Sequence, residues 1–202
     1  MFPSLMCATF LGTVGAEAWF PPLPVEDVAR NLIQLRNRNG IPPTTKSGLG
    51  YIAAAGPRAY PALRVVLEDP WYMEGTKDLA LRVLCGQPYD RSMFVDPAVK
   101  LLGHEERFVR QAALSLLSEI GGGEQVETVF PLLYHEDVYT RKPAIKAIGA
   151  MGDVQHVPVL AKYLSPLPPN LILGGTFHTA VQDAIKELEK KPAPKTKSAD
   201  KK

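Results

Sequence analysis

The chain has 202 residues, of which 46% are hydrophobic, 22% charged and 8% aromatic, so it can bury a core without disulfides or structural metals. This composition excludes collagen, a mucin-like stalk, a disulfide scaffold and a polytopic membrane protein. The net charge of +2 is unevenly distributed. Lys190–Lys202 holds six lysines against one aspartate, while residues 1–189 hold 17 basic and 20 acidic side chains. The slightly acidic body disfavours sequence-specific binding of nucleic acid.

The first 18 residues have the pattern of a secretory signal. They carry no charge before Glu17, and an apolar run from Leu5 to Val14 is followed by Ala16-Glu17-Ala18, a small-x-small cleavage pattern. No Lys or Arg precedes the run, although a signal normally begins with one. We expect a bacterial signal peptide over residues 1–18, which favours an exported or periplasmic location over the cytoplasm. The alternative is an apolar helix that packs on the first repeat.

Apolar side chains recur at spacings of three and four along most of the remaining chain, the pattern of amphipathic helices. From these stripes we expect five helix pairs, over residues 25–55, 57–86, 94–121, 123–152 and 154–189. No segment combines strand-like alternation with turn signals at both ends. We therefore predict an all-α domain over residues 19–189.

An interruption, SPLPPNLILGGT, lengthens the last predicted pair at residues 165–176. Its prolines and glycines predict a loop. The run Leu171-Ile172-Leu173 is more apolar than a solvated loop needs. We expect the loop to pack against the terminal helices, and the alternative is a lip that binds a partner.

A tandem repeat with a period of 31 residues organises the middle of the chain, where Leu101–Ala113 aligns with Leu132–Ala144. The shift superposes Leu101 on Leu132, His104 on His135, Glu105 on Glu136, Phe108 on Tyr139, Arg110 on Arg141, Ala113 on Ala144, Leu117 on Ile148 and Gly121 on Gly152. Because one helix pair cannot bury its apolar face, stacked neighbours must build a continuous core.

Glycine and proline mark the ends of the predicted helices. Gly121 and Gly152 each follow the last apolar residue of a second helix, where we expect a left-handed cap. Pro131 and Pro143 fall deeper in their helices and predict a kink or a later helix start.

The C-terminal segment Lys190–Lys202 has no residue larger and more apolar than alanine or proline. Such a segment cannot offset its own ordering entropy, so we predict a disordered, solvated, lysine-rich tail. The functional alternative is weak attraction to an anionic surface such as a membrane, a wall polymer or nucleic acid.

Residues 56–188 resemble HEAT-like repeats, specifically the short bacterial type grouped with phycobilisome lyase repeats. The likeness lies in the Leu-Leu end of the first helix, the acidic turn, and the Arg-x-x-Ala-x-x-x-Leu-x-x-Ile-Gly pattern of the second helix. The resemblance implies an armadillo-like, right-handed α-solenoid of about five stacked helix pairs, a HEAT-like superhelix. It also implies an interaction scaffold, because most of the family serves as one.

The doubled His104-Glu105 and His135-Glu136 pairs are the candidates for metal ligands. Helices that pack side by side lie about 8–10 Å apart, so the two imidazoles could approach each other. The pairs resemble the His-Glu iron ligands of deoxyhypusine hydroxylases, which are HEAT-repeat enzymes. In that family the pairs sit within a helix, whereas here they fall in the turn between two helices.

The same turns also have a structural interpretation, which we favour. Acidic side chains at a helix start satisfy free amide groups and complement the helix dipole. Glu106 and Arg110 are four residues apart, as are Asp137 and Arg141, a spacing that supports a helix. In HEAT-like repeats the equivalent acid and arginine form a ladder between units, so we expect these four residues to be a structural ladder.

Other chemical motifs are absent from the sequence. It has no phosphate-binding glycine loop after a strand, no zinc-spaced cysteine set and no nucleophile elbow. Cys85 lies in a helical apolar stripe with no histidine nearby in sequence, and we expect a buried, inert thiol. We therefore expect no cofactor and no catalytic residue.

These observations predict a non-enzymatic scaffold or adaptor that binds another protein. Trp71, Tyr72 and Met73, between the helices of the second pair, are candidate contacts, as are Phe108 and Tyr139. For the last two we favour the interpretation that each ring staples its helix to the repeat core. The alternative functions are a repeat-fold enzyme, either hydroxylase-like or bilin-lyase-like, and an adaptor that uses the lysine tail on an anionic surface.

Overall fold

A computed structural model describes residues 21–36, 48–164 and 174–191. Over these residues the chain is helical, and the longer elements are α1 (Val25–Arg36), α2 (Gly48–Ala55), α3 (Tyr60–Glu68), α4 (Glu74–Leu84), α5 (Val95–Leu101), α6 (Arg107–Ile120), α7 (Gly123–Val129), α8 (Val138–Met151), α9 (Val157–Leu164) and α10 (Gly174–Glu189). Single turns of 3₁₀ helix at Gly56–Ala59, Ser92–Phe94, Phe130–Tyr134 and Val154–His156 adjoin several of them. No strand occurs in the described residues.

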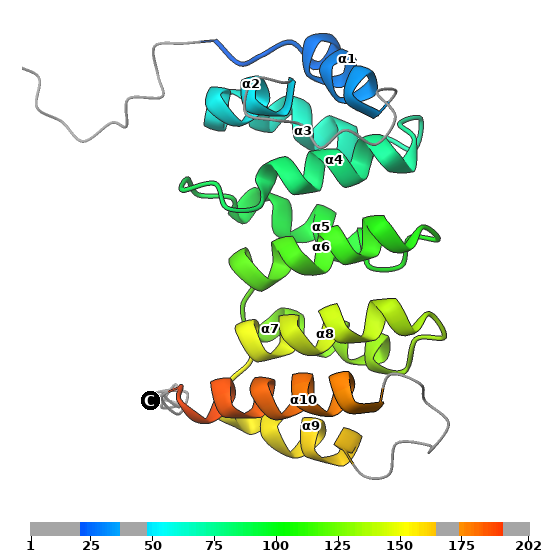
Figure 1. The fold of residues 1–202 in the computed structure, drawn as a ribbon. Coiled ribbons are helices and arrows are strands. Elements are labelled where there is room, and N and C mark those ends of the chain that lie inside the picture. The colour runs from blue at the N-terminus through cyan, green and yellow to red at the C-terminus, as the bar shows by residue number, and fades with distance from the viewer. Residues whose placement is uncertain (1–20, 37–47, 165–173, 192–202) are drawn as a thin grey trace, which may run out of the picture.

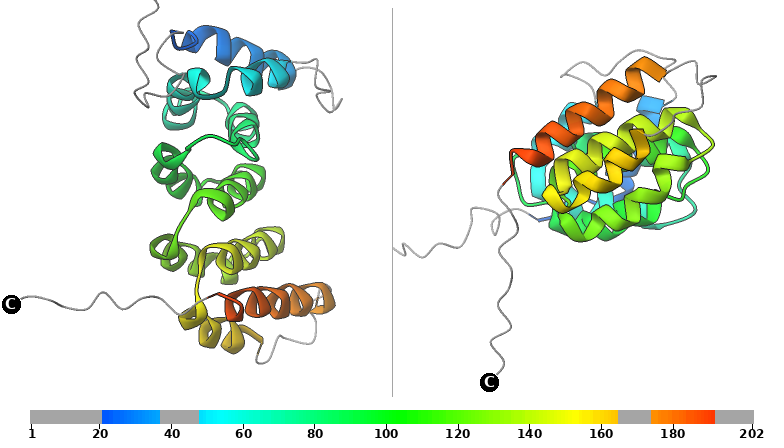
Figure 2. Two further views of the ribbon diagram at one scale, coloured as in Figure 1. Left: turned by 90° about the vertical axis from the view of Figure 1, so that its left-hand side faces the viewer. Right: turned by 90° about the horizontal axis from the view of Figure 1, so that it is seen from below.

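The helices stack as pairs in two layers (Figures 1 and 2). The second helices of successive pairs, α4, α6, α8 and α10, pack side by side in one layer, and α3, α5, α7 and α9 form the other. Helix α1 packs on α2, α3 and α4 at the N-terminal end of the stack. Each helix mainly contacts its own partner and the next pair, which is the nearest-neighbour packing of a solenoid.

The five predicted helix pairs correspond to the observed ones, so the predicted all-α stack of helix pairs is confirmed. The reason lies in the apolar stripes. In α6 the side chains at positions 109, 113, 116 and 117 are buried, and they lie on one face of the helix. The buried apolar side chains form one continuous core that runs from Leu23 to Leu188. Each fully buried leucine in it contributes about 1.5–3 kcal/mol.

The prediction of left-handed caps at Gly121 and Gly152 is wrong. Both residues have negative φ angles, −76° and −72°, and extended ψ angles. Glycine is needed there because a neighbour comes close. A Cβ on Gly121 would meet the Leu117 carbonyl oxygen at 2.7 Å, and a Cβ on Gly152 would meet the Ile148 carbonyl oxygen at 2.7 Å. The glycines with positive φ in the described residues are instead Gly56 and Gly86.

The two deep prolines have different effects. Helix α7 ends at Val129, and Pro131 lies in the first turn of the 3₁₀ helix that follows, where proline is tolerated. Pro143 lies inside α8, which begins five residues earlier, at Val138. The predicted later helix start therefore does not occur at Pro143.

Lys191 belongs to the helical body, although the sequence placed it in the tail. Its ammonium group donates hydrogen bonds to the carbonyl oxygens of Gly149, Ala150 and Gly152, at the C-terminal end of α8. The predicted signal peptide, most of the 165–176 loop and residues 192–202 lie outside the described residues. Within the described part of the chain, no helix is long and apolar enough to cross a membrane.

Candidate interaction surface

The predicted site residues gather along one edge of the stack, where α4, α6 and α8 begin (right in Figure 1). The turns before these helices are one repeat apart, so equivalent residues of successive repeats follow one another along the edge. Exposed loops and helix starts held on a rigid core are common sites of binding.

The two histidines hold the turns before α6 and α8 in the same way. His104 Nδ1 accepts a hydrogen bond from the backbone N–H of Glu106 at 3.1 Å, and His135 Nδ1 accepts one from Asp137 at 3.0 Å. One ring nitrogen of each histidine is therefore engaged within its own turn. In the described residues no group of three or more His, Cys, Asp or Glu side chains could hold a metal ion.

Arg110 links the turn before α6 to the turn before α8. Its Nη2 lies 2.7 Å from Asp137 Oδ2, and its Nε donates to Thr140 Oγ1 at 3.1 Å. Its Nη1 donates to the carbonyl oxygens of His104 and Glu105. Arg110 is almost fully buried, and a buried charge is tolerated when it is paired and hydrogen-bonded in this way.

The charge on Asp137 is stabilised by the same network. Burial pushes the pKa of this carboxyl up, but hydrogen bonds from the Thr140 hydroxyl and the Tyr139 backbone N–H, together with the Arg110 guanidinium, outweigh burial and hold the pKa below its ordinary value. Asp137 is also the N-cap of α8, so the carboxylate both starts the helix and joins two repeats.

The other two predicted ladder residues are placed differently. The guanidinium of Arg141 donates through Nε to the carbonyl oxygen of His135 at 2.6 Å. Neither Glu106 with Arg110 nor Asp137 with Arg141 forms an ion pair along its helix in the described structure, because each arginine points back to its preceding turn. The contact between units is thus made by Arg110 and Asp137.

The residues before α4 divide into buried and exposed side chains. Trp71 is 88% exposed, and its backbone N–H donates to Asp69 Oδ1 at 2.8 Å. Met73 is also exposed. Tyr72 packs against the hydrophobic core, so among these three candidates it is the least accessible.

Phe108 and Tyr139 are exposed and share a guanidinium. Phe108 is 48% exposed and Tyr139 57%, so neither ring staples its helix by burial in the core. The guanidinium carbon of Arg107 lies 4.7 Å from the centre of the Phe108 ring and 5.1 Å from that of Tyr139. Both distances fall within the range of cation–π contacts. We call Trp71, Met73, Phe108 and Tyr139 the aromatic edge.

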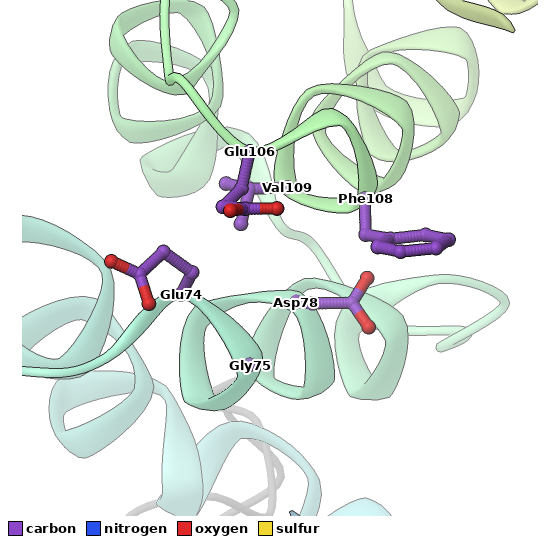
Figure 3. A pocket seen from close by; sticks show the side chains of 6 residues that line it. All are labelled: Glu74, Gly75, Asp78, Glu106, Phe108 and Val109. Carbon is purple, nitrogen blue, oxygen red and sulfur yellow. The ribbon is translucent and has the colours of Figure 1, made fainter.

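A pocket of about 240 Å³ opens between α4 and α6 beside the aromatic edge (Figure 3). It is lined by Glu74, Gly75, Asp78, Glu106, Phe108 and Val109. In Figure 3 the Glu106 side chain reaches from the start of α6 toward α4, the Glu74 carboxylate points to the side opposite the Phe108 ring, and the Asp78 carboxylate lies beside that ring. A pocket with several carboxylates and one aromatic ring can hold a cation.

Cys85 lies away from this edge, at the C-terminal end of α4. Burial, together with the nearby Glu119 carboxylate, raises the pKa of its thiol to about 11, while the Arg91 guanidinium opposes the rise. A thiol with so high a pKa is almost entirely protonated at neutral pH and is a poor nucleophile.

Sequence reasoning missed several residues of this surface. It did not single out Arg107, Gln111 or Thr140, although all three make contacts between α6 and α8. No local pattern marks them, because their roles depend on the side chain that the next repeat places opposite. The comparison of one repeat with the next, position by position, is the signal that could have found them.

The geometry is that of stacked helical repeats, and a comparison with known families agrees. Residues 95–169 match the model of HEAT repeats. Proteins built from such repeats typically bind other proteins along their extended surfaces. A comparison with curated proteins found no match to this chain.

Proposed function

We propose that this chain is a non-enzymatic scaffold that binds another protein along the aromatic edge. The observation that carries the proposal is the exposure of large aromatic side chains at the starts of successive second helices: Trp71 in the turn before α4, and Phe108 and Tyr139 at matching positions of α6 and α8. Aromatic side chains are enriched in the energetically important centres of protein interfaces. Exposed aromatic residues gathered along one edge therefore indicate a binding surface.

The resemblance to the short bacterial, phycobilisome-lyase-like subtype of HEAT repeats supports the same role, because most proteins of that kind are interaction scaffolds. The network of Arg110 and Asp137 supports it further, since it fixes the spacing between two turns of the edge. A surface whose spacing is fixed before binding loses less conformational entropy when the partner arrives.

The test compares two variants of the full chain in quantitative capture from cells of its source. The first is Trp71→Ala with Phe108→Ala and Tyr139→Ala, and the matched control is Tyr51→Ala, another exposed aromatic residue, which lies on α2. We expect a stoichiometric protein partner with the wild type and with the control, and its loss with the triple variant. Equal thermal stability of the variants must be shown by circular dichroism.

Retention of the partner by the triple variant would contradict the proposal. So would a stoichiometric iron or zinc content of the purified protein that is lost in the double variant His104→Ala, His135→Ala. That outcome would favour the hydroxylase-like alternative, in which the two histidines are ligands.

A further inference from the structure

The α4–α6 and α6–α8 junctions are the same place in successive repeats. Helix α4 begins at Glu74 and α6 begins at Arg107, so Glu74 and Arg107 occupy the same position in their repeats. The six residues that line the pocket therefore have six counterparts in the next junction. Glu74 corresponds to Arg107, Gly75 to Phe108, Asp78 to Gln111, Glu106 to Asp137, Phe108 to Tyr139, and Val109 to Thr140.

Arginine side chains of the chain itself fill the α6–α8 junction. Arg107 lies over the Tyr139 ring, with its guanidinium carbon 5.1 Å from the ring centre. Arg110 pairs with Asp137 at 2.7 Å. This junction therefore holds guanidinium groups against an aromatic ring and a carboxylate.

The α4–α6 junction keeps the ring and the carboxylate, but α4 supplies no arginine to them. The Arg107 guanidinium, which lies 4.7 Å from the centre of the Phe108 ring, comes from α6 itself. Glu74 occupies the position that Arg107 has in the α6–α8 junction, and Lys77 occupies the position that Arg110 has there. Lys77 forms no ion pair with Glu106 in the described structure, and the carboxylates of Glu74 and Glu106 have no hydrogen-bond partner there. Asp78 is paired with Arg82 at 2.9 Å. The pocket lies between α4 and α6 at the positions that match those of Arg107 and Tyr139 in the α6–α8 junction.

We infer that this pocket receives an arginine side chain of the partner protein. Its guanidinium would take the place that Arg107 has one repeat below, against the Phe108 ring, and would pair with Glu74 and Glu106. A guanidinium suits the site because it is planar, stacks on aromatic rings and donates to two carboxylates at once. The inference rests on the proposed function and adds the chemistry of the residue that the surface recognises.

The test uses the full chain with 4-fluorophenylalanine in place of phenylalanine, and the probe is arginine with acetylated and amidated ends. The ¹⁹F resonance of Phe108 is assigned from the Phe108→Leu variant. We expect the Phe108 signal to shift saturably with capped arginine. Capped citrulline, which has nearly the same shape without the charge, should leave it unshifted. Capped lysine should bind more weakly. Equal binding of citrulline, or no saturable shift with arginine, would overturn the inference.

Four substitutions test the pocket, and one of them is the control. Glu106→Gln and Glu74→Gln should each weaken binding of capped arginine about fivefold, the order expected for a partly exposed ion pair. Glu105→Gln is the matched control, because Glu105 is exposed in the same turn but does not line the pocket, and it should bind as the wild type does. Glu74→Arg places a guanidinium at the position of Arg107 and should abolish binding while the chain stays folded. Full binding by Glu74→Arg or by both glutamine variants would overturn the inference.

The outcomes separate this inference from the proposed function. A partner that is lost with the aromatic variants but kept with Glu74→Gln and Glu106→Gln leaves the scaffold in place and overturns the arginine pocket. Saturable binding of capped arginine with no partner captured on the aromatic edge supports the pocket and contradicts the proposed function.

Discussion

The side chain of Gln111 donates a hydrogen bond of 2.9 Å to the carbonyl oxygen of Tyr139, the carbonyl that Pro143 leaves without a donor inside α8. In a regular helix the N–H of residue 143 would donate to this oxygen, but proline has no N–H. A side chain from the preceding repeat therefore satisfies a backbone group of the next. This explains how α8 tolerates a proline in its interior.

This relationship predicts a coupling between the two residues. Gln111→Ala should lower the free energy of unfolding by about 1 kcal/mol, because the Tyr139 carbonyl loses the hydrogen bond from the Gln111 side chain. In a Pro143→Ala background the new N–H supplies the helical hydrogen bond, so the same substitution should cost close to nothing. Urea unfolding of the four proteins measures the cycle. An equal cost of Gln111→Ala in both backgrounds would show that the hydrogen bond does not compensate for the proline.

The Asp137 carboxylate should make the stability of the chain depend on acid pH. Its pKa is lowered in the folded chain, so the folded state binds the proton less readily than the unfolded state. The resulting stabilisation is complete above the unfolded pKa and is lost as the pH falls through the folded pKa, in the range below about pH 4. Asp137→Asn should remove about 1–2 kcal/mol at pH 7 and less at pH 3.

Chemical unfolding between pH 7 and pH 3 measures this difference. Glu136→Gln, an exposed carboxyl in the same turn, is the matched control and should change stability little at either pH. If Asp137→Asn cost as much at pH 3 as at pH 7, the Arg110 ion pair would not be the source of the stability.

Lys191 should stabilise the C-terminal end of α8. Its ammonium group meets the Gly149, Ala150 and Gly152 carbonyls, where the helix dipole is negative. Lys191→Met should lower the free energy of unfolding by about 1 kcal/mol. Lys190→Met is the matched control, because Lys190 makes an exposed ion pair with Glu187, and its effect should stay within a few tenths of a kcal/mol. Similar effects of the two substitutions in urea unfolding would argue against this cap.

Cys85 should resist alkylation in the folded chain. Its pKa of about 11, against an ordinary value of 9.0, lowers the thiolate fraction near neutral pH about a hundredfold. In a Cys7→Ser background, iodoacetamide at pH 8 should modify Cys85 rapidly in urea and very slowly without it. Intact-mass spectrometry follows the reaction. Comparable rates in the two conditions would show that the thiol is reactive in the folded protein.

The helical architecture could be predicted from the sequence because its signal is local. Apolar side chains at spacings of three and four define the faces of α6 and α8, and the 31-residue shift from Leu101 to Leu132 shows that one unit follows another. A pair with one apolar face must stack on its neighbours, so periodicity alone leads to the solenoid. The start of each edge helix, and hence the place of Phe108 and Tyr139, follows from the same pattern.

The candidate site depended on distances between repeats, which no local pattern contains. The four-residue spacing suggested that Arg110 pairs with Glu106, while the resemblance to HEAT-like repeats implied a ladder between units. The packing of α6 on α8 brings Arg110 to Asp137. Likewise, Gly121 and Gly152 end their helices, yet they are glycines because the Leu117 and Ile148 carbonyl oxygens lie close to them. The α6–α8 junction holds Arg107, whereas the α4–α6 junction has a pocket beside Glu74. This difference depends on which side chains adjacent repeats place opposite each other, and only the tertiary structure determines that.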